Sequence, residues 1–182
     1  MSFISVPPRY TIRLLHPKLT VLVAALVNEH HVNLMTAAWC MPVSASPPMI
    51  AISIAPRRFT HELILRNREF TINIMSMEHL KEVHYCGTVS GRAEDKLSRT
   101  GFTLEKSSKI RTPYLREAVA ALECVLANSV RAGDHTLFLG EVVEAHVRRG
   151  IFDRKYLIDR VDLILYVGEG EYTTTLKSTK KP

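Results

Sequence analysis

The sequence has little cysteine: three residues in 182, Cys40, Cys86 and Cys124, and no Cys-x-x-Cys pair. An odd number of cysteines without paired spacing argues against a disulfide framework and fits a reducing compartment. The longest apolar run near the start, Val21 to Val27, is too short to span a bilayer, and the polar turn after it is not a signal-peptide cleavage site. We therefore expect a cytoplasmic, soluble protein without a membrane segment.

Complete motifs for a metal or a dinucleotide are also lacking. His61-Glu62 begins the zinc motif His-Glu-x-x-His, but Leu65 stands where the second histidine is required. Gly168-x-Gly170 lacks the third glycine of the dinucleotide fingerprint. No serine–histidine–aspartate arrangement and no pair of carboxylates points to hydrolysis. We therefore predict that the chain has no metal site.

Negative charge is scarce relative to positive charge, so the chain has a net charge of +6 and a pI of about 9.4. A net positive charge permits binding to nucleic acid, an acidic membrane surface or phosphorylated ligands. The basic residues are spread along the chain, however, and only Lys177 to Lys181 forms a cluster, within a polar tail over 176–182 that we expect to be solvated. Aromatic residues make up 7% of the chain and do not interleave with a basic stripe, so a nucleic-acid-binding barrel is the least favoured interpretation.

The length and patterning favour one mainly β domain over 1–182 with short helices. Residues 1–18 contain three prolines and are predicted to be an irregular lead. A proline-rich turn is predicted at 41–48 and a hairpin turn at 131–135. Because strict β-α-β alternation is missing, we expect antiparallel pairing in a barrel. Strands are predicted at 20–27, 32–38, 49–55, 70–75, 119–130, 136–147 and 162–167, with an extension at 171–175. Helices are predicted at 60–67, at 76–85 with a stop at Cys86-Gly87, and within 91–99.

The junction after the third of these strands carries a chemical signal. Arg57 and Arg58 follow Pro56, and Thr60 is predicted to cap the next helix. A helix start presents unpaired N–H groups and positive partial charge, and guanidinium groups suit phosphate. The junction therefore forms a candidate anion cradle. The alternative is an ordinary capped helix with two solvated arginines, and the local features alone favour it.

Several longer segments resemble the flavin reductase-like family of FMN-binding split barrels, and its flavoredoxin and ferric reductase branch above all. They occur in the family's order between about 32 and 142 and comprise Asn33-Leu-Met-Thr-Ala-Ala-Trp39, Met49-Ile-Ala-Ile-Ser-Ile-Ala55, Arg57-Arg-Phe-Thr-His-Glu-Leu-Ile64, Phe70-Thr-Ile-Asn-Ile74, Cys86-Gly-x-x-Ser-Gly-Arg-x-x-Asp-Lys96 and Gly133-Asp-His-x-x-Phe-x-Gly-Glu-Val142. The resemblance implies an antiparallel Greek-key split β-barrel. It also implies a homodimer with FMN near the subunit interface.

The resemblance further implies which residues contact FMN. Asn33 and the backbone of Met35, Thr36, Ala37 and Ala38 would lie along the isoalloxazine, with Trp39 close by. Ser53, Arg57, Arg58 and Thr60 would hold the ribityl phosphate, one arginine on the phosphate and one in solvent. Around them stand Ala55, Phe59 and Ser90.

Three further residues would act on the flavin ring. Lys96 would lie near its N1–C2=O edge and stabilise the anionic reduced form. His135, in the Gly-Asp-His turn, would contact the flavin or an incoming nicotinamide. Either Tyr172 or Tyr166 would cover the ring, and we take Tyr172 as the candidate although the sequence does not decide between them.

These expectations leave two functions open. The first is an oxidoreductase that uses NADH or NADPH to reduce FMN and passes the electrons to an acceptor. The second is a flavoredoxin-like electron carrier with no nicotinamide reaction of its own. The flavin supplies the redox chemistry in both, and the protein supplies orientation, polarity and access.

Overall fold

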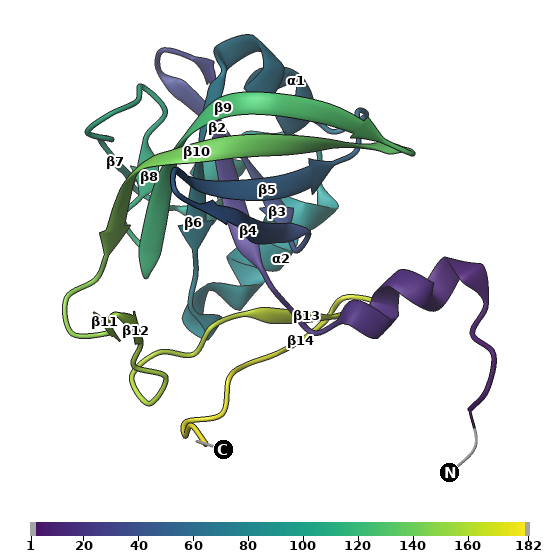
Figure 1. Cartoon of the computed structure of the whole chain (residues 1–182). Coiled ribbons are helices and arrows are strands. Elements are labelled where there is room, and N and C mark those ends of the chain that lie inside the picture. The colour runs from purple at the N-terminus through teal and green to yellow at the C-terminus, as the bar shows by residue number, and fades with distance from the viewer. Residues whose placement is uncertain (1–2, 181–182) are drawn as a thin grey trace.

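The computed structural model describes residues 3–180, and its centre is a seven-stranded antiparallel sheet that curls around a core (Figure 1). The strand order is β3-β2-β6-β9-β10-β5-β4. These strands are β2 (Val21–Asn28), β3 (His31–Ala37), β4 (Cys40–Ala45), β5 (Pro48–Ile54), β6 (Glu69–Ile74), β9 (Ala120–Ala132) and β10 (His135–Val147). The prediction of a mainly β, antiparallel split barrel is confirmed.

The inside of this sheet is filled by apolar residues from all its central strands. Phe70 of β6 and Phe138 of β10 are fully buried there. Gly140, two residues after Phe138, leaves room for the Phe70 ring, because a Cβ at 140 would lie 2.7 Å from Phe70 Cζ. The β9–β10 hairpin turns at Gly133, whose φ of +61° suits glycine. The predicted hairpin is therefore confirmed.

Helices pack against β2 and β3. The helix α1 (Phe59–Asn67) packs on β2, and α2 (Leu80–Thr88), which follows the 3-10 turn η2 (Met77–His79), packs on β3. The short helix α3 (Lys96–Thr100) also contacts β3. Leu63 and Ile64 of α1 belong to the same apolar cluster as Phe70 and Phe138, whereas α2 and α3 cover a second cluster that includes Leu34, Val83 and Ile164.

Short elements lie at the edges of the barrel. The 3-10 helix η1 (Pro8–Leu15) and a three-stranded sheet of β1 (Lys18–Leu19), β13 (Leu165–Gly168) and β14 (Glu171–Thr173) lie to one side of the barrel in Figure 1. Two small hairpins complete the list: β7 (Leu104–Glu105) with β8 (Tyr114–Leu115), and β11 (Phe152–Asp153) with β12 (Lys155–Tyr156). Between residues 3 and 180, no helix is long and apolar enough to cross a membrane.

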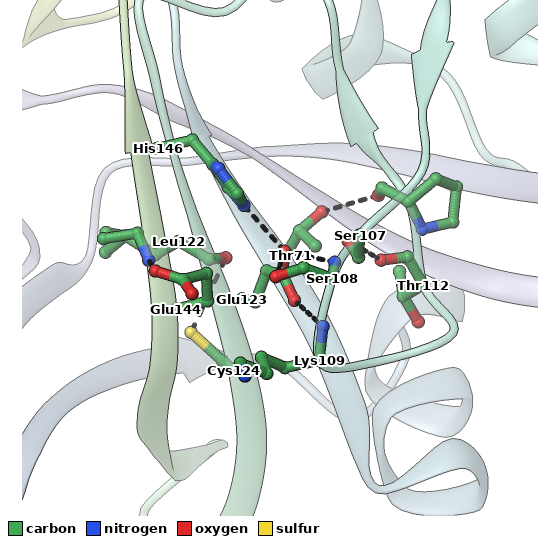
Figure 2. Close-up of polar contacts among 12 residues, drawn as sticks. Thr71, Ser107, Ser108, Lys109, Thr112, Leu122, Glu123, Cys124, Glu144 and His146 are labelled. Atoms are coloured by element: carbon green, nitrogen blue, oxygen red, sulfur yellow. Dashed lines mark hydrogen bonds and ion pairs between the residues drawn. The ribbon is translucent and has the colours of Figure 1, made fainter.

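A buried carboxylate fastens the loop before β8 to the barrel (Figure 2). The side chain of Glu123 on β9 is fully buried and accepts hydrogen bonds from the backbone N–H groups of Ser108 and Lys109, at 2.8 and 2.7 Å. His146 Nε2 lies 2.7 Å from the same carboxylate, and its ring stacks on Tyr114. Burial alone would raise the pKa of Glu123, but the hydrogen bonds from His146 and the two N–H groups outweigh it and hold that pKa below its ordinary value.

Several boundary predictions are wrong. Residues 8–15 of the lead form the 3-10 helix η1, which begins at Pro8 because proline suits the first helical position. The predicted turn at 41–48 is mostly strand β4, which tolerates Pro42 because it lies at the edge of the sheet. Strand 162–167 is replaced by β13, which starts at Leu165 and belongs to the side sheet.

Two predicted helix signals are also wrong. Thr60 does not cap α1, because the capping position is Arg58 and the Thr60 hydroxyl is bonded to Asn33 instead. Cys86-Gly87 does not stop α2, which continues to Thr88, and Gly87 lies where a Cβ would come within 3.2 Å of Thr36. The tail is not wholly solvated either, since Lys177 pairs with Asp162 at 2.6 Å.

Candidate functional site

The strand-to-helix junction presents two free cations at a helix start. After β5, Arg58 N–H donates to the carbonyl of Ala55 at 2.9 Å, which forms a tight turn around Pro56. Arg57 and Arg58 are both exposed, and neither guanidinium bonds to another side chain among residues 3–180. The first turn of α1 then begins with Phe59, so the unpaired N–H groups of this helix start lie at the same junction as the two arginines.

A hollow of about 140 Å³, the arginine hollow, opens at this junction. It is lined by Asn33, Met35, Arg57, Arg58, Phe59, Thr60, Val89, Ser90, Gly91 and Lys96. Asn33, only 3% exposed, donates through Nδ2 to the Thr60 hydroxyl at 2.7 Å, while its Oδ1 has no partner in the described part of the chain. A Cβ at Gly91 would lie 1.8 Å from that Oδ1, so only glycine permits this approach.

The loop that forms the far wall of the arginine hollow is fastened to α1. Arg92 pairs with Glu62 at 2.7 Å and lies 4.7 Å from the centre of the Phe59 ring. Asp95 caps α3 by accepting from the Ser98 N–H at 3.2 Å. These contacts hold the loop in the position that places Lys96 in the hollow.

Lys96 is the third cation of this hollow and is 4% exposed. Its Nζ donates to the carbonyl of Cys86 at 2.7 Å, and burial lowers its pKa, helped by the charge of Arg58. No carboxylate between residues 3 and 180 lines the hollow. Three cations and a helix N-terminus therefore form a site that suits a phosphate group.

A second hollow, the tryptophan hollow, adjoins the first and has a volume of about 230 Å³. It is lined by residues 35–39, Ser53, Ile54, Ala55, Arg57, Arg58, His135 and Tyr166. The Trp39 and His135 rings lie 4.8 Å apart, tilted by 34°. His135 Nδ1 lies 2.7 Å from Asp134 Oδ1, and this hydrogen bond lowers the pKa of Asp134. Small side chains at Ala37 and Ala38 leave the backbone accessible to a flat ligand.

A third hollow, the tyrosine hollow, continues beyond Ala37 and Ala38 and measures about 450 Å³. Its walls include Thr20, His84, Tyr166, Glu169 and Tyr172. Tyr166 lines both this hollow and the tryptophan hollow, whereas Arg58 lines all three. The three hollows therefore form one connected surface around Arg58.

The predicted site residues are divided among these hollows. The tryptophan hollow is lined by Met35, Thr36, Ala37, Ala38, Trp39 and His135, which were expected near the ring, together with Ala55 and with Ser53, which was expected at the phosphate. Asn33 and Lys96, expected beside the ring, line the arginine hollow with Thr60, Phe59 and Ser90. Tyr172 lies in the tyrosine hollow, away from Trp39, while Tyr166 reaches both.

Sequence reasoning missed residues that line the tyrosine hollow. Thr20, His84 and Glu169 come from three separate segments and carry no local motif. Gly91 lies inside the Ser-Gly-Arg segment, and a glycine there was the one available signal of a close approach. Nowhere between residues 3 and 180 do three His, Cys, Asp or Glu side chains gather as metal ligands would.

Comparison with known proteins matches residues 13–174 to the family model "Flavin reductase like domain". An uncharacterised protein of Archaeoglobus fulgidus is 40% identical over 136 residues, which are 75% of each chain. The reductase component of an FADH(2)-dependent resorcinol hydroxylase from Rhizobium sp. is 28% identical, over 76% of this chain and 75% of that one.

Solved structures agree in fold over the whole chain. An FMN-binding protein from Thermus thermophilus, solved with bound 1-cyclohex-2-enone, is 32% identical with a TM-score of 0.87, and the match covers 100% of this chain and 99% of that chain. A flavoredoxin from Methanosarcina acetivorans is 25% identical with a TM-score of 0.89, over 100% and 95% of the two chains.

Proposed function

Because this chain belongs to the flavin reductase-like family, we propose that it is an FMN-binding oxidoreductase that accepts hydride from NADH or NADPH. Bound FMN would supply the redox chemistry, and the chain would bind it, orient it and control access to it. The observation that carries this proposal is that a hollow with three cations shares Met35, Arg57 and Arg58 with a hollow walled by small residues and the Trp39 and His135 rings.

In this proposal the phosphate of FMN occupies the arginine hollow. Arg57, Arg58 and buried Lys96 supply positive charge, and Thr60 and the start of α1 supply hydrogen-bond donors. This arrangement gives Lys96 a phosphate contact in place of the ring-edge contact expected from the sequence. Arg57 and Arg58 both line the arginine and tryptophan hollows, so either can bridge phosphate and ring, and Arg58, which lines the tyrosine hollow as well, is the arginine chosen for the test.

The isoalloxazine would then lie in the tryptophan hollow. The backbone from Met35 to Ala38 offers hydrogen-bonding groups beside small side chains. Tyr166, which lines this hollow, is favoured over Tyr172 as the residue that covers the ring. His135 is held by Asp134 and packs on Trp39, so it can give or take a proton close to the reacting edge.

Exposed apolar residues support the proposal that the protein is a homodimer. Ile12, Leu14 and Leu15 on η1 are exposed, as are Met41 and Val43 on the edge strand β4. Apolar side chains gathered on a projecting helix and on an open sheet edge are typical of a surface that a second copy covers. The Rhizobium relative is a reductase component by name, which makes an oxygenase one class of electron acceptor to test.

The similarity to a flavoredoxin supports a second candidate, an FMN electron carrier without its own nicotinamide reaction. Both candidates require the same flavin contacts. They differ in whether NADH or NADPH bleaches the bound flavin in the absence of another reductase.

The deciding experiment is an anaerobic absorption titration of FMN-loaded protein with NADH and then NADPH. Bleaching by either nucleotide supports the reductase, and bleaching by dithionite alone supports the carrier. Arg58→Ala is expected to weaken FMN binding at least tenfold, because a charge-assisted hydrogen bond contributes about 1.5–3 kcal/mol. Arg99→Ala, an exposed arginine outside the three hollows, is the matched control. Protein that retains no FMN after soaking and desalting would contradict both candidates.

A further inference from the structure

The end of the β9–β10 hairpin, which carries His135, extends beyond the sheet. Within the described chain, β10 pairs with β5 as far as Thr136, which lies opposite Ile54. The residues between the two strands, 131–134, are all exposed at the tip of the hairpin (Figure 1). Backbone with few buried contacts opens more easily than the sheet it leaves. The position of His135 therefore depends on the contacts made at this end of β10.

His61 of α1 makes one of these contacts. Its Nε2 lies 2.8 Å from the Thr136 hydroxyl, at the residue where pairing of β10 with β5 ends. The edge of one ring faces the other where His61 packs on the fully buried Phe138, with ring centres 5.0 Å apart. Burial lowers the pKa of His61, which favours the neutral imidazole. A hydroxyl both donates and accepts, so the bond to Thr136 forms with either neutral tautomer.

The alternation of side chains along β10 places His135 on the opposite face from this contact. Phe138 points into the apolar core, and Thr136, two residues before it, shares that face. His135 lies on the other face, where it lines the tryptophan hollow and packs on Trp39. The hairpin end is thus held from the inside by His61 and from the outside by Trp39.

The other end of this link is the helix start at the arginine hollow. His61 belongs to the first turn of α1, and its backbone N–H donates to the carbonyl of Arg58 at 3.0 Å. One side chain therefore joins the helix start to the strand that carries His135. Another aromatic ring at position 61 could pack on Phe138 as the imidazole does, so packing alone does not require a histidine here.

From these contacts we infer that His61 is a positioning residue, which through Thr136 fixes His135 relative to the start of α1. A ligand seated at the helix start then finds His135 at a constant place beside Trp39, and constant geometry is what a proton transfer requires. The inference rests on the proposed function for the task of His135 beside the flavin. The link itself belongs to the flavin-free chain and is tested there.

Fluorescence of Trp39, the only tryptophan, reports the position of His135. A protonated imidazole in contact with an indole quenches its emission, so the emission of flavin-free parent protein should fall as the pH is lowered from about 8 to about 5. His135→Asn should abolish this fall. The other ionisable groups around that ring pair keep their charge over this pH range, namely Asp134, Arg57, Arg58 and Tyr166.

Two substitutions remove the hydrogen bond and keep the size of the side chain similar: Thr136→Val and His61→Phe. The loss of one hydrogen bond shifts the ratio of held to released hairpin by about fivefold, so the fall in emission should shrink to about half or less in each variant. The double variant should lose no more than either single one, because the two side chains act as a pair. His61→Gln, whose amide stands in for the Nε2 nitrogen, should restore the parent response. Thr173→Val, an exposed strand threonine, is the matched control.

The FMN-loaded protein tests the consequence for the reaction. Among the described residues that line the three hollows Thr136 is absent, so Thr136→Val should leave FMN affinity within about twofold of the parent value. The rate of flavin reduction, by whichever nucleotide bleaches the parent, should fall about three- to tenfold. A change in rate without a change in affinity is the mark of a positioning role.

Three results would overturn the inference. The first is a parent-like fluorescence response in both Thr136→Val and His61→Phe. The second is an equal loss of response in Thr173→Val. The third is an unchanged reduction rate in a variant that has lost the response, which would leave the link without a role in the reaction. Failure of the parent to retain FMN contradicts the proposed function instead and leaves the fluorescence result standing, so the two proposals can fail separately.

Discussion

Replacement of Gly91 by alanine should damage the candidate phosphate site through one contact. The new Cβ would lie 1.8 Å from Asn33 Oδ1 and 2.8 Å from Asn33 Cγ, far inside van der Waals contact. The Phe59 ring, at 3.4 Å, needs no movement. The backbone at 91 is not in the left-handed region, so a β-carbon brings no conformational strain of its own. The Asn33 side chain must therefore move.

The cost of that movement follows from the contacts of Asn33. The side chain would lose its 2.7 Å hydrogen bond to Thr60, which is 1% exposed and has no other partner to hand. A buried polar group left unsatisfied costs about 1–3 kcal/mol, so we expect about 2 kcal/mol of lost stability. For a chain of this size that corresponds to a fall in Tm of about 4–8 °C. FMN affinity should fall about tenfold or more, because the lining of the arginine hollow is displaced.

Urea denaturation followed by fluorescence of the single tryptophan, Trp39, measures the stability, and quenching of FMN fluorescence measures the affinity. Asn33→Ala provides the control, because it removes the side chain that the new methyl group would strike. In that background, Gly91→Ala should cost less than about 0.5 kcal/mol. An equal cost in both backgrounds would refute the collision as the cause.

Three further substitutions probe other parts of the fold. Glu123→Gln should cost about 3 kcal/mol of stability at neutral pH. Since folding lowers the pKa of Glu123, this contribution is fully present above the unfolded pKa of about 4.3 and is lost as the pH falls through the lower folded pKa. The urea midpoints of parent and variant should therefore converge below about pH 4. Gly140→Ala should cost about 1–3 kcal/mol in the same assay, because its Cβ would overlap the fully buried Phe70 ring, and a parent-like midpoint would contradict that packing. Thr20→Val should raise stability by about 1 kcal/mol, because it removes a buried hydroxyl without a partner; a lower Tm would show that the hydroxyl is bonded after all.

The sequence was informative wherever a property is local. Periodicity and turn residues predicted β2, β3, β5, β6, β9 and β10 to within a few residues, as well as the hairpin at Gly133. The same local reasoning failed for 41–48, where prolines indicate a turn but an edge strand tolerates them. Whether a strand lies at an edge depends on the whole sheet and is not encoded near Pro42.

The candidate site also combines residues that the sequence predicts locally with residues that only the fold brings together. Arg57 and Arg58 were predicted as an anion cradle because they adjoin a helix start. Lys96 and Asn33 reach that cradle only through tertiary structure: the Arg92–Glu62 pair and the Asp95 cap bring the lysine from a different loop. The resemblance named both residues but placed them beside the ring. Both line one hollow with the two arginines, and of the two it is Lys96, a cation, that we propose as a phosphate contact.

The unpartnered oxygen of Asn33 limits what a ligand must offer in the arginine hollow. Among the described residues, the buried side-chain atoms without a partner are Asn33 Oδ1 and the hydroxyls of Thr20, Ser76, Thr174 and Thr175, so a missing partner does not by itself identify a site. An amide oxygen accepts hydrogen bonds, as phosphate oxygens do, so Asn33 Oδ1 needs an N–H or O–H of the ligand rather than its phosphate. FMN carries such donors in the hydroxyls of its ribityl chain and in the N–H of its ring. If one of them bonds to Asn33, FMN should raise the Tm of the parent more than that of Asn33→Ala, and an equal rise in both would remove this contact.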